Sequence, residues 1–307
     1  MAEVCHQHDR PLIVDEAWGA HLPFHPDLPA WAMDAGADIC VTSVHKMGSG
    51  LEQSSVFHLQ GDRITVPALK ATADLLGTTS PSVLVYAALD GWRRQMVQQG
   101  REIYDHTLRL AMTTRQRIDL IPGLRLYGRR EFCAMRRAAD FDPLQLVIDL
   151  SELQTDGYQA ADWLRTHQRM DMHMPDHRRI SAQLTHADDR STVNALVDAL
   201  HNLVDHVGEL RPAAEVDVPD PAELRLEQAG SPRDAFFGPS EAVPADRAAG
   251  RVAAEMLTPY PPGIPAVMPG ERLDRPVIDY LRTGLAAGMV IPDATDPSLD
   301  TFLVTAD

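Results

Sequence analysis

The sequence has few cysteines and no long apolar segment. Cys5, Cys40 and Cys133 are widely separated along 307 residues and form no disulfide framework, which favours reduced thiols in the cytoplasm. No apolar run approaches the roughly 20 residues that a membrane-spanning helix requires. The first ten residues lack a basic start followed by an apolar stretch, so no signal peptide is predicted. We therefore expect a soluble cytoplasmic protein with no membrane partner.

Positive charge is also scarce. The chain has 28 Lys and Arg against 44 Asp and Glu, which gives a formal net charge of −16. Because no basic field would gather a polyanion, we expect no nucleic-acid partner. A hydrophobic fraction of 44% is ordinary for a globular protein. The length indicates two domains, or three small ones.

The first part of the chain predicts a parallel βαβ unit. Pro11–Ala17 and Asp38–Val44 are short apolar runs typical of buried strands, and a helix is expected over Leu28–Ala35. Ligands of open α/β sheets bind at the carboxyl ends of parallel strands. Asp15 and Lys46 fall at two such ends. We therefore expect them to face one pocket.

The remaining pattern predicts a long helix, an α+β layer and a C-terminal region. The long helix runs from Pro81 to about Ile118, with a break near Gly100. Further strands are expected at Ser55–Leu59, Leu124–Tyr127, Leu144–Leu150, about Asp171–Met174 and Ile180–Thr185. Further helices are expected at about Tyr158–Gln168, Ser191–Val207, near Ala242–Met256 and near Pro276–Ala287. These elements suggest domains at 1–120, 121–207 and 235–307, with a linker at 208–234.

The residues before Pro11 resemble the last two turns of an amphipathic helix that leads into the first strand. A parallel sheet with helices on both faces needs more strands than the first 120 residues offer. We therefore expect the chain to lack the N-terminal part of a larger α/β domain.

The segment Thr-Ser-Val-His-Lys at 42–46 carries the clearest chemistry. A lysine at a strand end, beside a histidine and a serine, suits a Schiff-base site whose neighbours donate hydrogen bonds to a phosphate. The carboxylate of Asp15 suits the pyridine nitrogen of pyridoxal 5'-phosphate (PLP), because negative charge there keeps the ring protonated. The alternative for any single lysine is a solvated surface position. The strand-end placement of Lys46 and its carboxylate partner favour the site.

Short motifs are spread in order over nearly the whole chain. They are Val-Asp-Glu-Ala-Trp-Gly-Ala-His (14–21), Ala-Gly-Ala-Asp (35–38), Ser-Val-His-Lys (43–46), Leu-Leu-Gly-Thr-Thr-Ser-Pro-Ser (75–82), Leu-Val-Ile-Asp-Leu (146–150), Asp-His-Arg-Arg (176–179), Phe-Phe-Gly-Pro-Ser-Glu-Ala-Val (236–243), Gly-Arg-Val-Ala-Ala-Glu (250–255), Pro-Tyr-Pro-Pro-Gly-Ile-Pro (259–265) and Met-Pro-Gly-Glu (268–271). Together they resemble the ornithine/lysine/arginine decarboxylase family of fold-type I PLP-dependent enzymes.

The resemblance implies an α/β fold: the back half of a PLP-dependent-transferase-like large domain, then an α+β small domain and a C-terminal α+β domain. It implies decarboxylation of arginine, lysine or ornithine to the amine and CO2, in polyamine biosynthesis. It also implies a homodimer or a larger homo-oligomer with the pocket at the subunit interface.

The resemblance also implies roles for single residues. Lys46 is similar to the Schiff-base lysine, Asp15 to the partner of the pyridine nitrogen, and His45 and Ser43 to phosphate contacts. The other positions implied are Ala17 and Trp18 beside the ring, and Thr79 and Ser80 at a phosphate across the subunit interface.

The chain departs from the family pattern at its start. The family's phosphate-cradling turn and the aromatic ring stacked on the cofactor lie well before the aspartate, and both would precede Met1. Two alternatives therefore stay open. One is a non-catalytic fragment or pseudoenzyme that pairs with an intact paralogue. The other is a different fold-type I reaction, such as that of an aminotransferase.

Other candidates are weaker. The pairs His6/His8, His21/His25 and His173/His177 lack the Cys or carboxylate ligands that would complete a tetrahedral set, so no metal site is expected. Glu255 is a candidate contact for the distal cation of a basic amino acid, against the ordinary alternative of a solvated carboxylate.

Overall fold

The computed structural model describes residues 1–134, 138–220, 222–260 and 263–306. Its residues separate into two compact units. Unit 1 comprises Met1–Arg117, Tyr127–Leu146 and Gln183–Ala195. Unit 2 comprises Ile118–Leu126, Val147–Ala182 and Leu196–Asp307.

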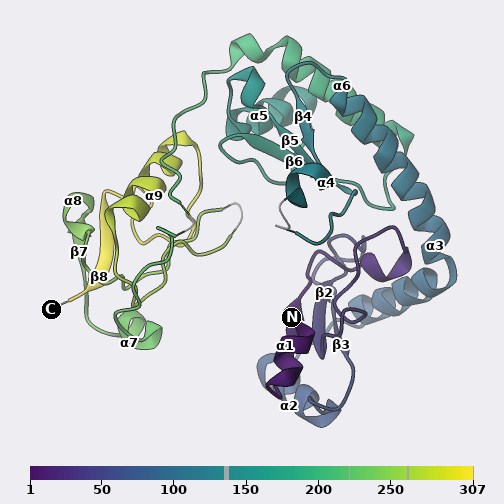
Figure 1. Ribbon diagram of the computed structural model, residues 1–307, viewed down its shortest axis with the longest axis horizontal. Helices are drawn as coiled ribbons and strands as arrows, with labels where there is room; N and C mark the ends of the chain where they lie inside the picture. The colour runs from purple at the N-terminus through teal and green to yellow at the C-terminus, as the bar shows by residue number, and fades with distance from the viewer. Residues whose placement is uncertain (135–137, 221, 261–262, 307) are drawn as a thin grey trace. The chain divides into compact units, whose positions relative to one another are not determined.

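Unit 1 begins with a short helix and a three-stranded sheet (Figure 1). The helix α1 (Ala2–Gln7) leads into β1 (Ile13–Asp15), which pairs in parallel with β2 (Ile39–Ser43). The third strand, β3 (Ser55–Leu59), pairs with β2 in the antiparallel direction. The helix before the first strand, the parallel pair and the third strand agree with the sequence predictions. The burial predicted for the first strand is wrong, because Ile13 of β1 is 64% exposed and Val14 is only half-buried.

The connection between β1 and β2 differs from its prediction. The helix expected over Leu28–Ala35 is wrong, because the connection consists of the 3₁₀ helix η1 (Leu22–Phe24) and turns. An eight-residue helix is marginal by itself. Here the backbone N–H of Ala32 donates to the carboxylate of Glu16 at 3.1 and 3.2 Å, so this part of the segment is held by a side chain of the neighbouring motif.

Two helices follow β3. The first, α2 (Val66–Leu76), is absent from the sequence predictions, although Thr65 caps its first turn by accepting from Ala68 N. The second, α3 (Val83–Asp119), is continuous for 37 residues, so the break expected near Gly100 is wrong. A Cβ at Gly100 would lie 3.1 Å from Phe24 Cβ. The glycine therefore permits close packing against the helix instead of ending it.

A second sheet has the order β4-β5-β6, with β4 (Arg125–Tyr127), β5 (Gln145–Asp149) and β6 (Arg179–Gln183). All three strands match predicted strands to within two residues at each end, and β5 is buried, as its continuous apolar run predicts. The short helix α4 (Arg129–Phe132) follows β4. The strand expected at about Asp171–Met174 is wrong: the segment has no regular structure, although His173 N donates to Ser181 O at 2.8 Å and Met174 O accepts from Ser181 N at 3.0 Å.

Helices accompany this sheet. The helix α5 (Gly157–Trp163) continues into the π-helical turn η4 (Leu164–Gln168), and α6 covers Arg190–Asp205. Both helical regions were predicted. Single 3₁₀ turns, η3 (Ser151–Leu153) and η5 (Val207–Glu209), complete the region.

The C-terminal part of unit 2 has its own core. The helices α7 (Pro232–Phe237), α8 (Ala245–Ala248) and α9 (Arg275–Ala287) accompany the antiparallel strands β7 (Ser240–Pro244) and β8 (Thr301–Thr305). Buried residues of α9 and β8 contribute to one apolar cluster. The C-terminal helix is confirmed.

The helix expected near Ala242–Met256 is wrong, because its first residues pair with β8 in the register Ser240↔Thr305 and Pro244 ends that strand. Much of the stretch expected as a linker, 208–234, lacks regular structure among the described residues, but Gln228 bridges to Glu271 and α7 begins within it. Pro261 and Pro262 of the 259–265 motif lie outside the described residues.

The start of α5 gives a stability test. A Cβ at Gly157 would lie 1.9 Å from the carbonyl oxygen of Arg179 and 2.4 Å from that of Asp176. Because both atoms belong to the backbone, Gly157→Ala should lower the free energy of unfolding by about 3 kcal/mol or more. Urea unfolding followed by circular dichroism measures the change.

Gly91 in α3 is the matched control, since a Cβ there would meet nothing within 4 Å. Gly91→Ala should leave stability unchanged or raise it by up to about 1 kcal/mol, because alanine favours the helix. Equal stability of Gly157→Ala and the unmodified chain would contradict the tight packing.

Candidate active site

The parallel strands of unit 1 bring the two predicted site segments together. Asp15 is the last residue of β1 and pairs in register with Val41 of β2. The backbone N–H of Ser43 donates to the carbonyl of Ala17 at 3.2 Å, which joins the segment after β1 to the end of β2. Lys46 follows in a turn in which its N–H donates to Ser43 O at 3.1 Å. The prediction that these residues gather at one sheet edge is consistent with this geometry.

Lys46 is half-buried and its ammonium lies over an aromatic ring. The Nζ atom is 4.6 Å from the centroid of the Trp18 ring, a cation–π distance. Among the described residues it makes no ion pair with Asp15. The chain contains only one other lysine, Lys70, which is exposed and paired with Asp74. Lys46 is therefore the one lysine of this chain that lies just after a strand of the parallel pair.

Asp15 is exposed and only partly engaged. Its Oδ1 accepts the backbone N–H of Ala17 at 3.0 Å, a local turn bond that orients the carboxylate. In the part of the chain that the structure describes, the other oxygen has no hydrogen-bond partner. A carboxylate held by one oxygen and open at the other can accept from a protonated ring nitrogen.

His45 is engaged with the loop that precedes β3. Its Nδ1 lies 3.0 Å from the carbonyl of Ser54, and its Nε2 lies 3.6 Å from Glu52 Oε1. Ser43 is half-buried, and its hydroxyl has no hydrogen bond within the described ranges. The Ser43 hydroxyl is therefore open to a ligand, whereas the His45 imidazole would first have to give up its contact with Ser54 O or Glu52.

Three other residues were predicted from the sequence as site residues: Thr79, Ser80 and Glu255. Thr79 and Ser80 are exposed between α2 and α3, and they form no hydrogen bond with Asp15 or Lys46 in the described structure. Glu255 is only 5% exposed, and its carboxylate oxygens accept the backbone N–H groups of Thr295 and Leu303 at 2.8 and 2.7 Å. This geometry favours a structural role for Glu255.

A half-buried carboxylate, Glu16, and a buried thiol, Cys40, lie beside the site and were missed by the sequence predictions. Glu16 accepts a thiol hydrogen bond from Cys40, with Sγ to Oε2 at 3.5 Å. Burial raises the pKa of Glu16, and burial together with the Glu16 charge raises the pKa of Cys40 to about 12. The available signal was strand alternation, which turns Glu16 to the face opposite Asp15.

The structure also bears on metal binding and membrane insertion. No cluster of His, Cys, Asp and Glu able to hold a metal ion occurs among the described residues. His21 and His25 instead pair with Asp142 and Asp105, each at 2.9 Å. Within the same residues, no helix has the length and apolar character to cross a bilayer.

Comparisons with known proteins identify the family. The model of the Orn/Lys/Arg decarboxylase major domain matches residues 1–134, and that of the C-terminal domain of the same family matches residues 221–292. The chain belongs to the Orn/Lys/Arg decarboxylase family. Its fold is accordingly the mixed α/β fold of these fold-type I proteins, which the sequence motifs predicted.

Members of the decarboxylase family resemble the chain over nearly its whole length. It is 36% identical to arginine decarboxylase of Halalkalibacterium halodurans over 99% of this chain, and 35% identical to that of Bacillus subtilis. The chain spans 62% of the length of each. The solved structure of lysine decarboxylase A from Pseudomonas aeruginosa matches with a TM-score of 0.76 at 21% identity, over 96% of this chain and 53% of that one.

The chemistry of the decarboxylase-family site fits the cofactor PLP. The site offers one primary amine, one carboxylate with an open oxygen, and one unpartnered hydroxyl at the same sheet edge. These are the groups that a pyridine ring with an aldehyde and a phosphate requires.

The motif Ala-Gly-Ala-Asp of the decarboxylase family ends at a buried carboxylate that fixes this edge. Asp38 Oδ2 accepts from Leu12 N and His6 Nε2, both at 2.8 Å, and Arg63 Nη1 lies 3.6 Å from Oδ1. Burial by itself raises the pKa of Asp38, but these hydrogen bonds and the Arg63 charge outweigh it and hold the pKa below its usual value of 3.8.

Asp38→Asn should therefore lower the free energy of unfolding at pH 7 by about 1–3 kcal/mol. Because the folded pKa is lowered, the stabilisation is present above the unfolded pKa of 3.8 and is lost as pH falls through the folded value. Urea titrations at pH 7 and pH 3 should show the gap between the two proteins narrowing in acid. The exposed Asp34→Asn is the control, and an equal loss in both variants would contradict this role.

Proposed function

We propose that this chain carries the cofactor-holding lysine of a PLP-dependent decarboxylase that acts on a basic amino acid. The observation that carries the proposal is the placement of Asp15 and Lys46 at the carboxyl ends of the neighbouring parallel strands β1 and β2. Relatives named arginine decarboxylase that match 99% of the chain support arginine as the first substrate to test, ahead of lysine and ornithine. The products would be the corresponding amine and CO2.

Each residue of the site has a separate role in this proposal. Lys46 would hold the cofactor through its amine, and Asp15 would keep a proton on the pyridine nitrogen by accepting it in a charge-assisted hydrogen bond. Ser43 and, after release from Ser54, His45 would donate to the phosphate, while Trp18 and Ala17 would lie beside the ring. When bound, PLP supplies the electron sink that loss of an α-carboxylate requires.

We also propose that the chain works as a homo-oligomer in the cytoplasm. The support is a set of apolar side chains around the α2–α3 connection with large exposed fractions: Leu75 81%, Leu76 80%, Val83 75% and Leu84 73%. Such a patch marks an interaction surface in soluble proteins. Thr79 and Ser80 lie within this connection, where a second subunit would place them near a neighbouring site.

Cofactor titration tests the proposal directly. PLP added to the purified chain should produce a saturable visible absorbance that Lys46→Ala abolishes, because that variant lacks the amine. Borohydride reduction should then fix PLP to the peptide that contains Lys46. Lys70→Ala is the matched control, since it removes the only other lysine and should leave the absorbance unchanged.

Release of CO2 from arginine, lysine and ornithine separates the proposal from its alternative. CO2 release from one of them that depends on Lys46 supports a decarboxylase. Folded chain that binds no PLP, or binds it without releasing CO2, would favour the non-catalytic fragment that pairs with an intact paralogue.

Asp15→Asn tests the second residue. The amide cannot hold the pyridine nitrogen protonated, so CO2 release should fall by about 100-fold or more while PLP is still bound. Asp34→Asn, an exposed carboxylate of the same unit, should retain full turnover. Unchanged turnover in Asp15→Asn would exclude the proposed role.

A further inference from the structure

The loop at residues 47–54, directly after Lys46, returns the chain to His45. The backbone nitrogen and the Nδ1 atom of His45 lie 3.3 and 3.0 Å from the carbonyl oxygen of Ser54. Ser54 is itself buried, and its N–H donates to Leu51 O at 3.1 Å. The end of the loop is therefore fastened to the residue that precedes Lys46.

The backbone of this loop is tightly constrained. Ser49 and Gln53 have φ angles of 53° and 69°, in the left-handed region that residues other than glycine rarely adopt. A Cβ at Gly48 would lie 2.7 Å from the backbone oxygen of Val44, so only glycine fits there without a shift. These positions lie on both sides of Glu52 and restrict the path that brings it back toward the site.

Glu52 is the one charged residue of the loop 47–54, and it lies beside His45. Its Oε1 is 3.6 Å from His45 Nε2. Within the described ranges it has no other ion pair or hydrogen bond. Because the carbonyl of Ser54 already accepts from Nδ1, Nε2 is the nitrogen left for a ligand, and Glu52 lies on that side.

The part of the site proposed for the phosphate is poor in positive charge. A phosphate monoester carries a charge of about −1.5 to −2 at pH 7. Of the two residues proposed to bind it, Ser43 offers a neutral hydroxyl and only His45 can become a cation. The carboxylate of Glu52 therefore opposes the single charge that this pair of residues can supply.

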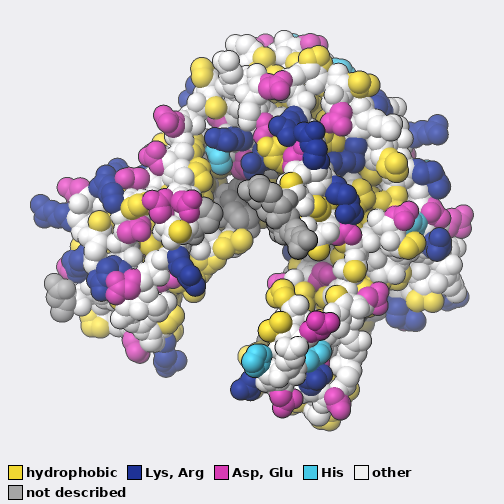
Figure 2. Space-filling view, in the orientation of Figure 1, with side chains coloured by type: hydrophobic (Ala, Val, Ile, Leu, Met, Phe, Trp, Pro, Cys, Tyr) yellow, Lys and Arg dark blue, Asp and Glu magenta, His cyan; other side chains and the backbone are white. Residues whose placement is uncertain are grey.

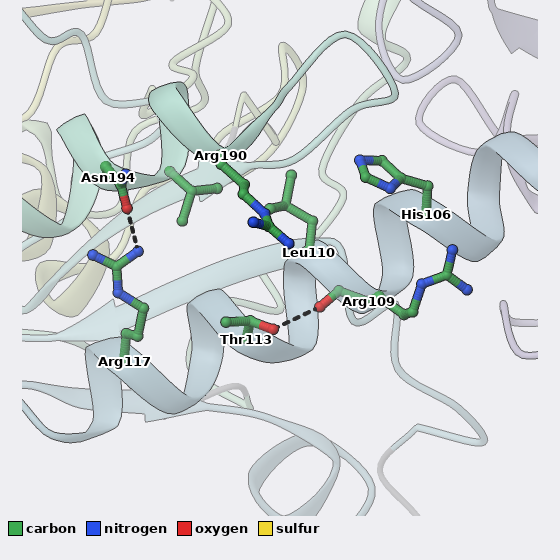
Figure 3. A pocket seen from close by; sticks show the side chains of 8 residues that line it. His106, Arg109, Leu110, Thr113, Arg117, Arg190 and Asn194 are labelled. Carbon is green, nitrogen blue, oxygen red and sulfur yellow. Dashed lines mark hydrogen bonds between the residues drawn. The ribbon is translucent and has the colours of Figure 1, made fainter.

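Charge is distributed differently elsewhere in the molecule. On the face drawn in Figure 2, acidic and basic side chains are interspersed. In unit 1, Arg109, Arg117 and Arg190 line one cavity that has no acidic side chain among its lining residues (Figure 3). At His45, by contrast, one imidazole faces one carboxylate. An anion that approaches this imidazole meets both charges.

We propose that Glu52 weakens the binding of PLP by this chain, because its carboxylate competes with the cofactor phosphate for His45 Nε2. The inference rests on the proposed function and adds an affinity-determining residue to it. Donation through Nε2 would preserve the hydrogen bond to Ser54, which donation through Nδ1 would break. The Glu52 side chain is 83% exposed, which leaves it room to turn away when the phosphate binds.

Titration of PLP into the 307-residue chain, followed by its visible absorbance, tests the inference. Glu52→Gln should lower the Kd for PLP by about three- to fivefold at low salt, because the amide removes the competing charge of an exposed pair. The gain should shrink as salt is raised. Pyridoxal, which has the same ring and aldehyde without the phosphate, should bind both proteins with Kd values within about twofold of each other.

Glu3→Gln is the matched control, since it removes the same charge from an exposed glutamate of unit 1 that lies in α1. It should leave the Kd for PLP within about twofold of the unmodified chain. In a His45→Ala background, Glu52→Gln should lose most of its effect, because the donor for which the two anions compete is gone. Glu52→Ala, a second variant without the charge, should bind PLP as tightly as Glu52→Gln.

Equal or weaker PLP affinity in Glu52→Gln, or an equal gain for pyridoxal, would overturn the inference. If the absorbance still depends on Lys46 in that case, the proposed function stands without it. Absence of the absorbance from every variant would refute the proposed function and this inference together. Circular dichroism establishes that each variant is folded.

Discussion

The buried carboxylate of Asp38 is the constraint on which the sheet of unit 1 depends. Its side chain holds Leu12 at the entrance to β1, its own N–H donates to Leu12 O, and its carbonyl accepts from Gln60 after β3. One residue thus connects the starts of two parallel strands and the end of the third. Side chains alternate between the two faces of a strand, so a slip of one residue moves every side chain to the other face. Fixing the pairing at the starts of β1 and β2 therefore also fixes which residues lie at their carboxyl ends. Asp15 and Ser43 therefore end neighbouring strands, and Lys46 follows Ser43 in a turn.

The same register gives Asp15, the last residue of β1, and Glu16, the residue after it, different surroundings. Asp15 is exposed and open to a ligand, whereas the next residue, Glu16, turns inward to Cys40 and Ala32. Two adjacent carboxylates therefore have different environments, and burial raises the pKa of Glu16. The inner carboxylate holds the connection between the strands, while the outer one is free for chemistry. A slip of one residue would exchange these roles, so the hydrogen bonds around Asp38 protect the site as well as the fold.

The sequence predicted what depends on local pattern and missed what depends on distant partners. Continuous apolar runs were sufficient to locate β1, β2 and β5, and the strand-end rule was sufficient to place Asp15 at the end of β1 and Lys46 just after β2. The helix predicted over 28–35 is wrong, and the sequence pattern does not show that Ala32 N donates to the carboxylate of Glu16, 16 residues earlier. Gly100 was interpreted as a helix break because the sequence does not show that Phe24 packs there. The cation–π contact between Lys46 and Trp18 was likewise invisible, since it depends on how two turns fold against each other.

The net charge of the chain likewise does not reveal how charge is distributed around a single cavity. A net charge of −16 argues against nucleic acid, which needs an extended basic surface to track many phosphates. It says little about one small anion, because charges more than about 8 Å apart are largely screened at physiological ionic strength. Arg109 and Arg117 of α3 and Arg190 of α6 line one cavity of unit 1, and no acidic side chain is among its lining residues. The spacing of the two α3 residues could be read from the sequence, whereas Arg190 joins them only through the packing of α6. The sum of charges and the potential at one place are therefore separate properties of this chain.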